Sequence, residues 1–473
     1  MLASELFGGK WIWEDTEITD ITIDSRQVKK GVLFICIDGQ NTDGHIFAQG
    51  AADNGAAAVV AEKEISCTAP VILCSDTKIE MAKIASKFYD RPEEKLKLVG
   101  ITGTNGKTTV SYLVKRILET AGKRVGIIGT NEILVGSDAV GIVSSTPTTP
   151  NSLELHKIFA KMLEMGATYV VMEVSSHALD LHRVYGLNYE AGVFTNLTRD
   201  HLDYHKTMEN YFLAKAKLFD ISKIGVVNID DEYGKRLEKV VSCEKLSVGT
   251  QNADICAKNI EMDEKGVRFT VCYGGKSAKA ELAISGMFSV YNALCAIGAA
   301  ISLGIDFETV IKGLAAAAGV KGRLERVPTE TDYSVIIDYA HTPDGLENVI
   351  NAINSFKKGR LITVFGCGGD RDASKRSIMG DIGTRLSDIS VITSDNPRTE
   401  NPQKIIDDIV SGVKEGIYEI IPDRREAIGY ALSIAKKGDV VLLAGKGQET
   451  YQILGKEKIH FDEREIVRDF LER

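Results

Sequence analysis

The chain has 473 residues, of which 44% are hydrophobic and 26% are charged. This is the composition of a soluble globular protein, and the chain is too long for one hydrophobic core. Its formal net charge of −9 excludes a general nucleic-acid binder, which would carry a basic surface. The start of the chain shows no basic segment followed by an apolar run, and no apolar stretch approaches the roughly 20 residues that span a bilayer. We therefore expect a cytoplasmic protein without a signal peptide or a membrane span.

The eight cysteines form no C-x-x-C pair and show no zinc-finger spacing. In a chain of this length, such cysteines indicate reduced thiols in the interior rather than a disulfide framework. They agree with the cytoplasmic location expected above.

Residues 1–92 alternate short strands and turns. The segments ITIDSR and GVLFICIDG are strand-like, AQGAADNGA is helix-like, and AAVVAE is again a strand. The polar segment YDRPEEK, which contains Pro92, predicts a domain boundary. We therefore expect a small α/β domain over residues 1–92.

A phosphate-binding loop is predicted in the stretch KLVGITGTNGKTTV, residues 97–110. An apolar strand runs into a glycine-bearing loop, and apolar residues then recur at helical spacing. This order points free backbone N–H groups and the positive end of a helix at an anion. Gly103 and Gly106 allow close approach of the backbone, Lys107 adds a charge, and the Thr108 hydroxyl can bind Mg²⁺.

The loop departs from the strict P-loop pattern, because Ile101 stands where that pattern has its first glycine. A phosphate-binding loop remains the favoured interpretation, since a strand precedes it and a helix follows. Such a loop does not by itself distinguish a kinase from a ligase or a switch protein.

Apolar strands alternate with amphipathic helices through the rest of the chain, which predicts mostly parallel sheets. Up to about residue 325 the strands include ATYVVMEV, AGVFTNL and KIGVVNI. A second series of strands then follows, in the segments SVIIDYAH, RLITVFGCGG, ISVITSDNPR and DVVLLAGKGQE. Each strand runs into a loop at the edge where open α/β sheets bind ligands. We predict an α/β protein of three domains: residues 1–92, a central domain over 93–326, and a doubly wound, Rossmann-like domain over 327–473.

His201 and His205 lie four residues apart in TRDHLDYH, a spacing that can place two zinc ligands on one helix face. The segment lacks the glutamate of H-E-x-x-H and a third nearby ligand. The sequence therefore favours a structural role for His205 over a zinc site.

Segments spread along the chain resemble the Mur ligase family of ATP-dependent amide-bond-forming enzymes. They are GTNGKTT, MEVSSHALDLHRV, FTNLTRDHLDYHKTMENYFLAKAKLF, KGRLERV, DYAHTPD, FGCGGDRD, SDNPRTENP and AGKGQETYQ, with IDSRQVKKGVLF and GQNTDGH near the N-terminus. The resemblance spans essentially the whole chain. It implies an N-terminal domain for a uridine nucleotide, a central ATPase and a C-terminal domain for an incoming amino acid.

The reaction that the resemblance implies is ligation of meso-2,6-diaminopimelate to UDP-N-acetylmuramoyl-L-alanyl-D-glutamate in peptidoglycan precursor synthesis. ATP would phosphorylate the D-glutamate carboxylate, and the amine would attack the acyl phosphate and expel phosphate. The implied partners are these small-molecule substrates and Mg²⁺, and we expect a monomer. L-lysine stays open as the amino acid. A ligase like folylpolyglutamate synthetase also stays open, although the N-terminal segment and DNPR argue against it, as does a nucleotide-binding subunit without catalysis.

The resemblance also implies which residues bind ATP and metal. Glu173 ends the strand YVVME, where a carboxylate can hold Mg²⁺ beside the phosphates, and His201 resembles a second metal ligand. Lys215, rather than its neighbour Lys217, matches a lysine that the family carbamylates with CO₂, which would turn a cation into an anionic ligand. The implied catalytic residues are Lys107, Glu173, His201 and Lys215, and the metal ligands are Thr108, Glu173, His201 and carbamylated Lys215. The implied ATP-binding residues are Gly103, Thr104, Asn105, Gly106, Lys107, Thr108, Thr109, Asn292, Arg323 and His341.

Arg323 could neutralise the charge of the transferring phosphoryl group as an arginine finger does, although a surface salt bridge is the alternative.

For the uridine nucleotide substrate the resemblance implies Ile23, Ser25, Gln40, Asn41, Thr42, Thr148, Thr149, Ser175 and Arg183. Turn or cap chemistry explains any single one of these residues about as well.

For the amino acid the resemblance implies Arg371, Asp395, Asn396, Pro397, Arg398, Gly445 and Glu449. The Arg398 guanidinium can bind the distal carboxylate of diaminopimelate with two parallel hydrogen bonds, and lysine lacks that carboxylate. Glu449 and Asn396 would complement the distal ammonium and carboxylate.

Overall fold

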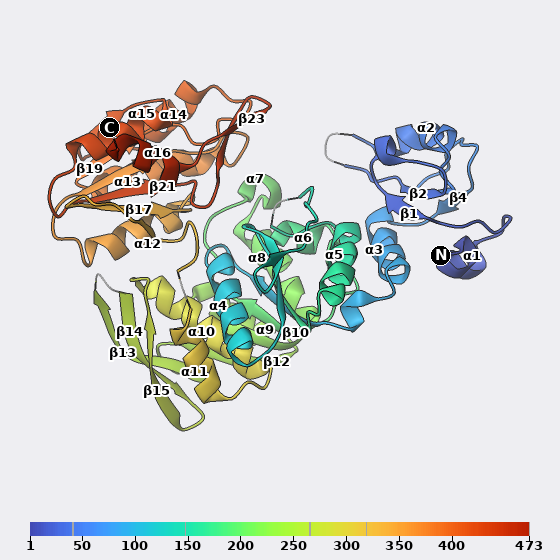
Figure 1. Cartoon of the computed structure of the whole chain (residues 1–473), viewed down its shortest axis with the longest axis horizontal. Coiled ribbons are helices and arrows are strands. Elements are labelled where there is room, and N and C mark those ends of the chain that lie inside the picture. The colour runs from blue at the N-terminus through green and yellow to red at the C-terminus, as the bar shows by residue number, and fades with distance from the viewer. Residues whose placement is uncertain (40–41, 147, 264–265, 318, 473) are drawn as a thin grey trace. The chain divides into compact units, whose positions relative to one another are not determined.

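The computed structural model describes residues 1–39, 42–146, 148–263, 266–317 and 319–472 (Figure 1). The chain forms two compact units. The first contains Met1–Thr102, Gly122–Gly192 and Lys217–Lys223, and the second contains Gly103–Ala121, Val193–Ala216 and Ile224–Arg473.

The N-terminal part of the first unit is a parallel four-stranded sheet. Its strands follow one another in the order β1 (Asp20–Thr22), β2 (Val32–Ile35), β3 (Ala58–Ala61) and β4 (Val71–Leu73). The helices of this part are α1 (Ala3–Phe7), α2 (Ala48–Asp53) and α3 (Thr77–Phe88). The side chain of Asp76 begins α3 by accepting hydrogen bonds from the N–H groups of Lys78 and Ile79, which satisfies donors that have no partner within the helix.

A second set of strands in the first unit leads to the phosphate loop. Their order is β5 (Lys97–Thr102), β9 (Tyr169–Glu173), β6 (Val125–Ile128), β7 (Ile133–Val135) and β8 (Asp138–Ala139). The first three are parallel, and Ile101 of β5 pairs with Glu173 of β9. Glu173 is therefore level with the end of the strand that enters the loop. Helices α5 (Ser152–Glu164) and α6 (Ser176–Asp180) also belong here, and β10 (Tyr189–Phe194) runs from this unit into the second.

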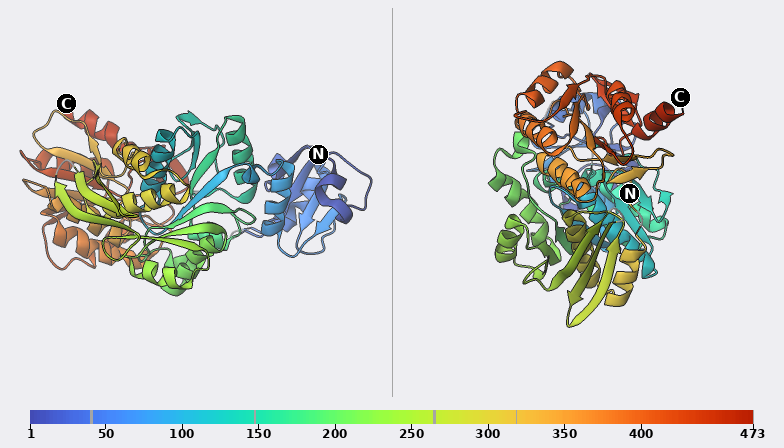
Figure 2. Two further views of the ribbon diagram at one scale, coloured as in Figure 1. Left: turned by 90° about the horizontal axis from the view of Figure 1, so that it is seen from below. Right: turned by 90° about the vertical axis from the view of Figure 1, so that its left-hand side faces the viewer.

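The second unit begins with the helix that follows the phosphate loop, α4 (Lys107–Thr120), against which α10 (Met287–Ser302) and α11 (Phe307–Ala315) pack. Strands β11 (Ser222–Asn228) and β12 (Glu244–Gly249) are parallel. They continue into the antiparallel strands β13 (Ile255–Asp263), β14 (Gly266–Tyr273) and β15 (Lys276–Leu282), the yellow-green ribbon of Figure 2. The remaining helices of this part are α7 (Leu202–His205), α9 (Glu232–Val240) and most of α8 (Met208–Asp220), whose last turn belongs to the first unit.

The C-terminal part is a six-stranded sheet with helices on both faces. Its order is β16 (Glu325–Val327), β17 (Ser334–Asp338), β21 (Val440–Ala444), β18 (Leu361–Phe365), β19 (Ile389–Ile392) and β20 (Tyr418–Ile420), and all but β16 are parallel. One core contains α12 (Pro343–Asn354), α13 (Arg376–Leu386) and α14 (Pro402–Val410). The other contains α15 (Arg424–Ile434) and α16 (Glu463–Leu471). A hairpin of β22 (Tyr451–Leu454) and β23 (Glu457–His460) lies beyond β21.

The predicted α/β class with mostly parallel sheets is confirmed, and so is the doubly wound C-terminal sheet. The expected domain boundaries after residues 92 and 326 stay predictions. Every helix within the described ranges is too short or too polar to cross a membrane. None of the eight cysteines forms a disulfide.

Candidate functional site

The phosphate loop has the backbone shape that only glycine adopts readily. Gly103 has φ 147° and Gly106, which caps α4, has φ 86°. A Cβ atom at Gly103 would collide with the Thr195 hydroxyl, and one at Gly106 would collide with the Asn292 amide. The loop therefore brings Asn292, a predicted ATP contact, against the start of α4, whose free N–H groups can bind phosphate.

The segment after β10 holds the loop in place. The Thr104 N–H donates to the Asn196 carbonyl over 2.9 Å, and the Asn105 N–H donates to the Asn196 side chain over 2.9 Å. The Thr195 hydroxyl donates to the Asn105 carbonyl over 2.6 Å. The loop is thus preorganised by hydrogen bonds from outside itself, which is what a phosphate cradle requires.

Two cations lie at the start of α4. Lys107 Nζ donates to the carbonyl oxygens of Gly103 and Thr104 over 2.9 and 2.8 Å. Arg323 Nη2 donates to Thr108 Oγ1 over 3.0 Å, and its guanidinium lies 4.7 Å from the ring centroid of Tyr339. Arg323 therefore contacts the helix that follows the predicted phosphate loop.

Lys215 of α8 lies directly beneath the loop. It is 1% exposed, and its Nζ donates to the Gly103 carbonyl over 2.8 Å and lies 4.7 Å from the Tyr211 ring centroid. Burial lowers the pKa of Lys215 well below its ordinary 10.5, and the charge of Lys107 lowers it further. Lys217, by contrast, makes a half-exposed ion pair with Asp180 at 2.8 Å. Of the two lysines, Lys215 is therefore the buried one with the lowered pKa, and Lys217 lies at the surface.

His201 lies in a turn with a strained backbone, directly after Asp200. Its φ is 54°, a left-handed value that non-glycine residues rarely adopt. Its Nε2 lies 3.4 Å from Asp200 Oδ2, and Lys375 Nζ lies 3.9 Å from Asp200 Oδ1. Burial raises the pKa of Asp200, but the charges of His201 and Lys375 outweigh burial and hold the pKa below its ordinary value. His205 is 5% exposed and stacks on Tyr211 with ring centroids 5.1 Å apart, which fits a structural role.

Two residues of this region were missed by sequence reasoning. Lys375 is 5% exposed although it follows a polar loop, and nothing in the sequence distinguished it from a surface lysine. Asp344 accepts a hydrogen bond from Asn105 Nδ2 over 2.7 Å. Asp344 is part of the segment DYAHTPD, so its motif was recognised although its contact with the phosphate loop was not. The predicted contact His341 lies near Lys375, and burial and then the charge of Lys375 lower the pKa of His341 to about 4.

Glu173 ends β9 as a buried carboxylate, 1% exposed. The N–H and the hydroxyl of Thr130 each donate to it over 3.0 Å. The Thr130 hydroxyl also lies 3.1 Å from that of Thr148, whose φ of 67° is left-handed. A predicted metal ligand and a predicted substrate contact are therefore linked through one threonine.

The other residues predicted for the muramoyl arm gather beside Glu173 in the first unit. Thr149 Oγ1 donates to the Glu173 carbonyl over 2.9 Å and accepts from the Ser175 N–H over 3.0 Å. Arg183 Nη1 donates to the Thr149 carbonyl over 3.0 Å. Thr148, Thr149, Ser175 and Arg183 thus form one cluster of hydroxyl and guanidinium groups with Glu173.

The predicted residues of the N-terminal sheet lie at one edge of it. Ser25 follows β1 and Thr42 follows β2, and the carboxyl ends of these parallel neighbours lie at the same edge. Ile23 is 36% exposed there. Gln40 and Asn41 lie outside the described residues.

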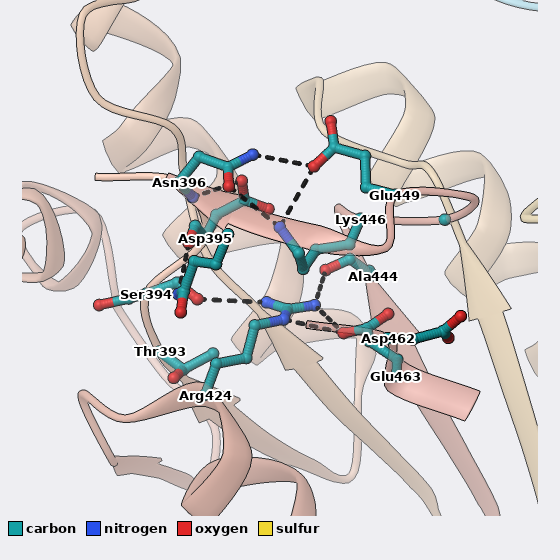
Figure 3. A network of polar contacts seen from close by, with 12 residues as sticks. Thr393, Ser394, Asp395, Asn396, Arg424, Ala444, Lys446, Glu449, Asp462 and Glu463 are labelled. Carbon is teal, nitrogen blue, oxygen red and sulfur yellow. Dashed lines mark hydrogen bonds and ion pairs between the residues drawn. The ribbon is translucent and has the colours of Figure 1, made fainter. Parts of the chain in front are cut away.

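The predicted amino-acid residues come from loops after β18, β19 and β21, so they share the carboxyl edge of the C-terminal sheet. Asn396 Nδ2 donates to Glu449 Oε2 over 2.9 Å (Figure 3). Asp395 is 7% exposed, and within the described chain its Oδ2 has no hydrogen-bond partner. A Cβ at Gly445 would lie 2.7 Å from that oxygen, so glycine there lets the two loops approach.

Arg371 and Arg398 add two guanidinium groups to the loops at this edge. Arg398 Nη1 donates to the Gly369 carbonyl over 2.7 Å, and Pro397 directly precedes Arg398 in the chain. Burial lowers the pKa of the Arg371 guanidinium, and the positive charge of Arg398 lowers it further. Two neighbouring positive charges favour a bound anion, such as a carboxylate.

Comparisons with known proteins agree over nearly the whole chain. The family model "Mur ligase family, catalytic domain" matches residues 17–96, "Mur ligase middle domain" matches 101–300, and "Mur ligase, glutamate ligase domain" matches 322–447. The chain is 50% identical over 464 residues to the UDP-N-acetylmuramoyl-L-alanyl-D-glutamate–2,6-diaminopimelate ligase 1 of Clostridium acetobutylicum, covering 97% of this chain and 95% of that protein.

Solved structures show the same likeness. The structure of a UDP-N-acetylmuramoyl-L-alanyl-D-glutamate–2,6-diaminopimelate ligase has a TM-score of 0.67 at 31% identity, with 96% of this chain and 94% of that chain covered. MurF from Acinetobacter baumannii has a TM-score of 0.69 at 19% identity, with 98% and 95% covered, which is a likeness of fold alone. The three-domain α/β fold expected from the sequence is thereby confirmed.

Proposed function

Because the chain belongs to the Mur ligase family, we propose that it is the ATP-dependent ligase that adds meso-2,6-diaminopimelate to UDP-N-acetylmuramoyl-L-alanyl-D-glutamate in peptidoglycan precursor synthesis. The observation that carries the proposal is the 50% identity, over 97% of the chain, to a relative that bears the name of this ligase. The reaction joins an acid to an amine, and ATP supplies the leaving group.

The phosphate loop holds ATP for the first step. The N–H groups at the start of α4 and the Lys107 ammonium bind its terminal phosphates, with Gly103, Thr104, Asn105, Gly106, Thr108 and Thr109 forming the cradle. Asn292, Arg323 and His341 complete the nucleotide contacts. Transfer of the γ-phosphoryl group to the D-glutamate carboxylate brings two anions together, so the cations Lys107 and Arg323 lower the barrier by neutralising charge.

The residues present fit Mg²⁺, which supplies charge neutralisation between the phosphates and the acceptor carboxylate when bound. The described ranges contain no group of three or more His, Cys, Asp and Glu side chains that could hold a metal by themselves. Mg²⁺ in nucleotide sites is usually held by one or two carboxylates together with phosphate oxygens and water. Glu173 and Lys215, the latter as its carbamate, are proposed to supply such groups, with the Thr108 hydroxyl and His201 as further ligands.

Lys215 is proposed to act as a carbamate. Its neutral amine would add to CO₂ with loss of a proton, which replaces a cation by an anionic oxygen ligand. The lowered pKa of Lys215 supports this step because only the unprotonated amine is a nucleophile. The 2.8 Å contact with Gly103 puts this amine beside the phosphate loop.

The C-terminal loops are proposed to hold the incoming amino acid. Arg398 and Arg371 would bind its distal carboxylate, and Asp395, Asn396 and Glu449 would bind ammonium and carboxylate groups, with Pro397 and Gly445 shaping the loops. One amine is left to attack the acyl phosphate carbon, and phosphate leaves from the tetrahedral intermediate. Two neighbouring guanidinium groups without a carboxylate to bind would repel each other, which favours diaminopimelate over L-lysine.

The uridine nucleotide is proposed to bind the edge that carries Ile23, Ser25 and Thr42, together with Gln40 and Asn41. Thr148, Thr149, Ser175 and Arg183 would contact the muramoyl-peptide arm. Hydroxyl donors and one arginine suit this oxygen-rich anion. The proposal includes a monomer in the cytoplasm, where ATP and the nucleotide substrates are made, and no nucleic-acid partner.

A direct assay tests the proposed function. The purified protein is supplied with ATP, UDP-N-acetylmuramoyl-L-alanyl-D-glutamate and either meso-diaminopimelate or L-lysine, and the product is identified by mass. Ligation of diaminopimelate with release of ADP is the expected result, and preference for L-lysine would correct the amino acid. Activity with folate and glutamate alone would replace the proposal by the folylpolyglutamate reaction.

A further inference from the structure

Lys446 is a buried lysine for which the reaction above has no role. It follows β21 and its side chain is 0% exposed. Its Nζ lies 3.1 Å from Asn396 Oδ1 and 3.2 Å from Glu449 Oε2, and 5.8 Å from the ring centroids of both Tyr451 and Phe461 (Figure 3). Lysine is almost never fully buried unless it is paired, so these contacts account for its position.

Lys446 helps to set the orientation of the Asn396 amide. Asn396 Oδ1 accepts from Lys446 Nζ and also from the backbone N–H of Ile453 over 3.0 Å. Because both partners are donors only, this side of the amide must be the oxygen. The amide nitrogen then faces Glu449, to which it donates over 2.9 Å. Lys446, Asn396 and Glu449 therefore form a closed triangle of hydrogen bonds.

The triangle uses only one of the two oxygens of the Glu449 carboxylate. Both Lys446 and Asn396 contact the same carboxylate oxygen, Oε2. In Figure 3 the other oxygen points away from both of them. The Glu449 side chain is 14% exposed, so this carboxylate can be reached by a ligand.

Lys446 also provides the positive charge between two buried acids. Burial raises the pKa of Glu449, and the charge of Asp395 raises it further, while Lys446 opposes both effects. Burial also raises the pKa of Asp395, but the charges of Lys446 and Arg424 outweigh burial and lower the pKa. Without the Lys446 ammonium, one of the two carboxyl groups would more readily take up a proton and lose its attraction for an ammonium group.

We propose that Lys446 is a positioning residue for the incoming diamino acid: its buried ammonium holds Asn396 and Glu449 in the orientation that binds an ammonium group of that substrate. The inference rests on the proposed function, because it concerns the affinity of the same ligase for its amino acid. It adds to the residues assigned above a side chain that acts only through its neighbours.

Steady-state kinetics of Lys446→Met test the inference. The KM for meso-diaminopimelate should rise by about 10-fold or more, the loss expected for one hydrogen bond to a charged group. The KM values for ATP and for the nucleotide substrate should stay at wild-type values, because these bind elsewhere. Lys446→Arg, which keeps the charge, should recover part of the loss. Lys456→Met, at an exposed position in the neighbouring hairpin, is the matched control and should behave as wild type.

A double-mutant cycle with Glu449→Gln identifies the route of the effect. If Lys446 acts through Glu449, adding Lys446→Met to the Glu449→Gln variant should raise the KM far less than it does in the wild type. An unchanged KM for diaminopimelate in Lys446→Met, or a parallel rise in all three KM values, would overturn the inference. Additive effects in the cycle would also contradict it.

Folding is checked by thermal unfolding and by ADP binding. If Lys446→Met does not fold, Lys446→Gln replaces it, since glutamine keeps a polar side chain of similar reach. If neither variant binds ADP as wild type does, Lys446 is a structural residue and the inference fails. A wild-type protein that does not ligate diaminopimelate would instead refute the proposed function, so the two failures are distinguishable.

Discussion

Lys215 Nζ lies 2.8 Å from the carbonyl oxygen of Gly103, so a fully buried lysine touches the first residue of the phosphate loop. Burial and the charge of Lys107 lower its pKa, and its amine is therefore uncharged over a wider range of pH than that of a surface lysine. An uncharged amine beside a phosphate site can react with CO₂, whereas an ammonium there would repel Mg²⁺.

The first prediction concerns CO₂. Removal of CO₂ and bicarbonate from the buffers should lower ligation activity, and adding bicarbonate should restore it. Lys215→Ala should be inactive, and short carboxylates such as acetate should restore part of its activity by replacing the carbamate oxygens. Lys217→Ala, two residues along the same helix, is the control and should stay active. Full activity of Lys215→Ala in the absence of any carboxylate would remove the carbamate from the mechanism.

The second prediction concerns Lys107. Because its ammonium meets the charge that develops on the transferring phosphoryl group, Lys107→Ala should lower kcat/KM for ATP-dependent ligation by about 100-fold to 1000-fold or more. Circular dichroism and thermal unfolding should show an intact fold. Lys123→Ala, at an exposed position just after α4, should keep wild-type activity. Wild-type turnover in Lys107→Ala would contradict the phosphate-loop assignment.

Local patterns were sufficient for the α/β scaffold and for the order of strand, glycine loop and helix at the predicted phosphate loop. The strand–glycine–helix order around Gly103 and Gly106 depends on backbone conformations that few other residues adopt, so it is visible in the sequence. The position of Glu173 also followed from pattern, because a carboxylate at the end of an apolar strand in a parallel sheet must lie at the ligand-binding edge.

Buried charged residues were harder to find. Lys375 and Lys446 stand in polar segments, and their burial arises only when loops from distant parts of the chain pack around them. Lysine on its own predicts a solvated side chain. Lys215 was singled out only by family resemblance, although the structure shows that burial makes it unusual. Periodicity reports which face of an element is apolar, and it carries no information on the partners of a charged side chain.

The third prediction concerns the choice of amino acid. Arg398 and Arg371 are proposed to bind the distal carboxylate, which lysine lacks, so Arg398→Ala should lose far more kcat/KM for meso-diaminopimelate than for L-lysine. A difference of about 10-fold to 100-fold corresponds to the loss of a charged hydrogen-bond partner. The measurement is the ratio of kcat/KM for the two amino acids. Equal losses for both would show that Arg398 does not contact that carboxylate.

The fourth prediction concerns pH. Burial and the charge of Asp395 raise the pKa of Glu449 above its ordinary 4.5. The carboxylate form, which attracts an ammonium group, is present above that pKa and is lost as the pH falls through it. The KM for diaminopimelate should therefore rise as the pH is lowered from about 8 toward 5. Glu449→Gln has no carboxyl group to titrate at this position, so its KM should be higher and should lack this rise. The same pH dependence in both proteins would assign it to another group.

The fifth prediction concerns stability in the C-terminal sheet. Arg424 of α15 and Glu463 of α16 form an ion pair at 2.8 Å, and both side chains are 0% exposed. Arg424 also donates to the Ala444 carbonyl over 2.8 Å, at the end of the strand that leads to Gly445. Arg424→Met leaves Glu463 buried without its cation, which should lower the free energy of unfolding by about 3–5 kcal/mol. Urea unfolding at neutral pH measures the loss.

The adjacent residue provides the matched control for this pair. Arg425 Nη1 lies 3.9 Å from Asp469 Oδ2 of α16, and both side chains are about half exposed. Water screens such a pair, so Arg425→Met should cost less than about 1 kcal/mol. The double variant Arg424→Met with Glu463→Gln should lose less stability than the sum of the two single variants. When both charged groups are removed together, no charge is left buried without its partner. If Arg424→Met and Arg425→Met lower the free energy of unfolding equally, the buried pair contributes no more to stability than the exposed pair.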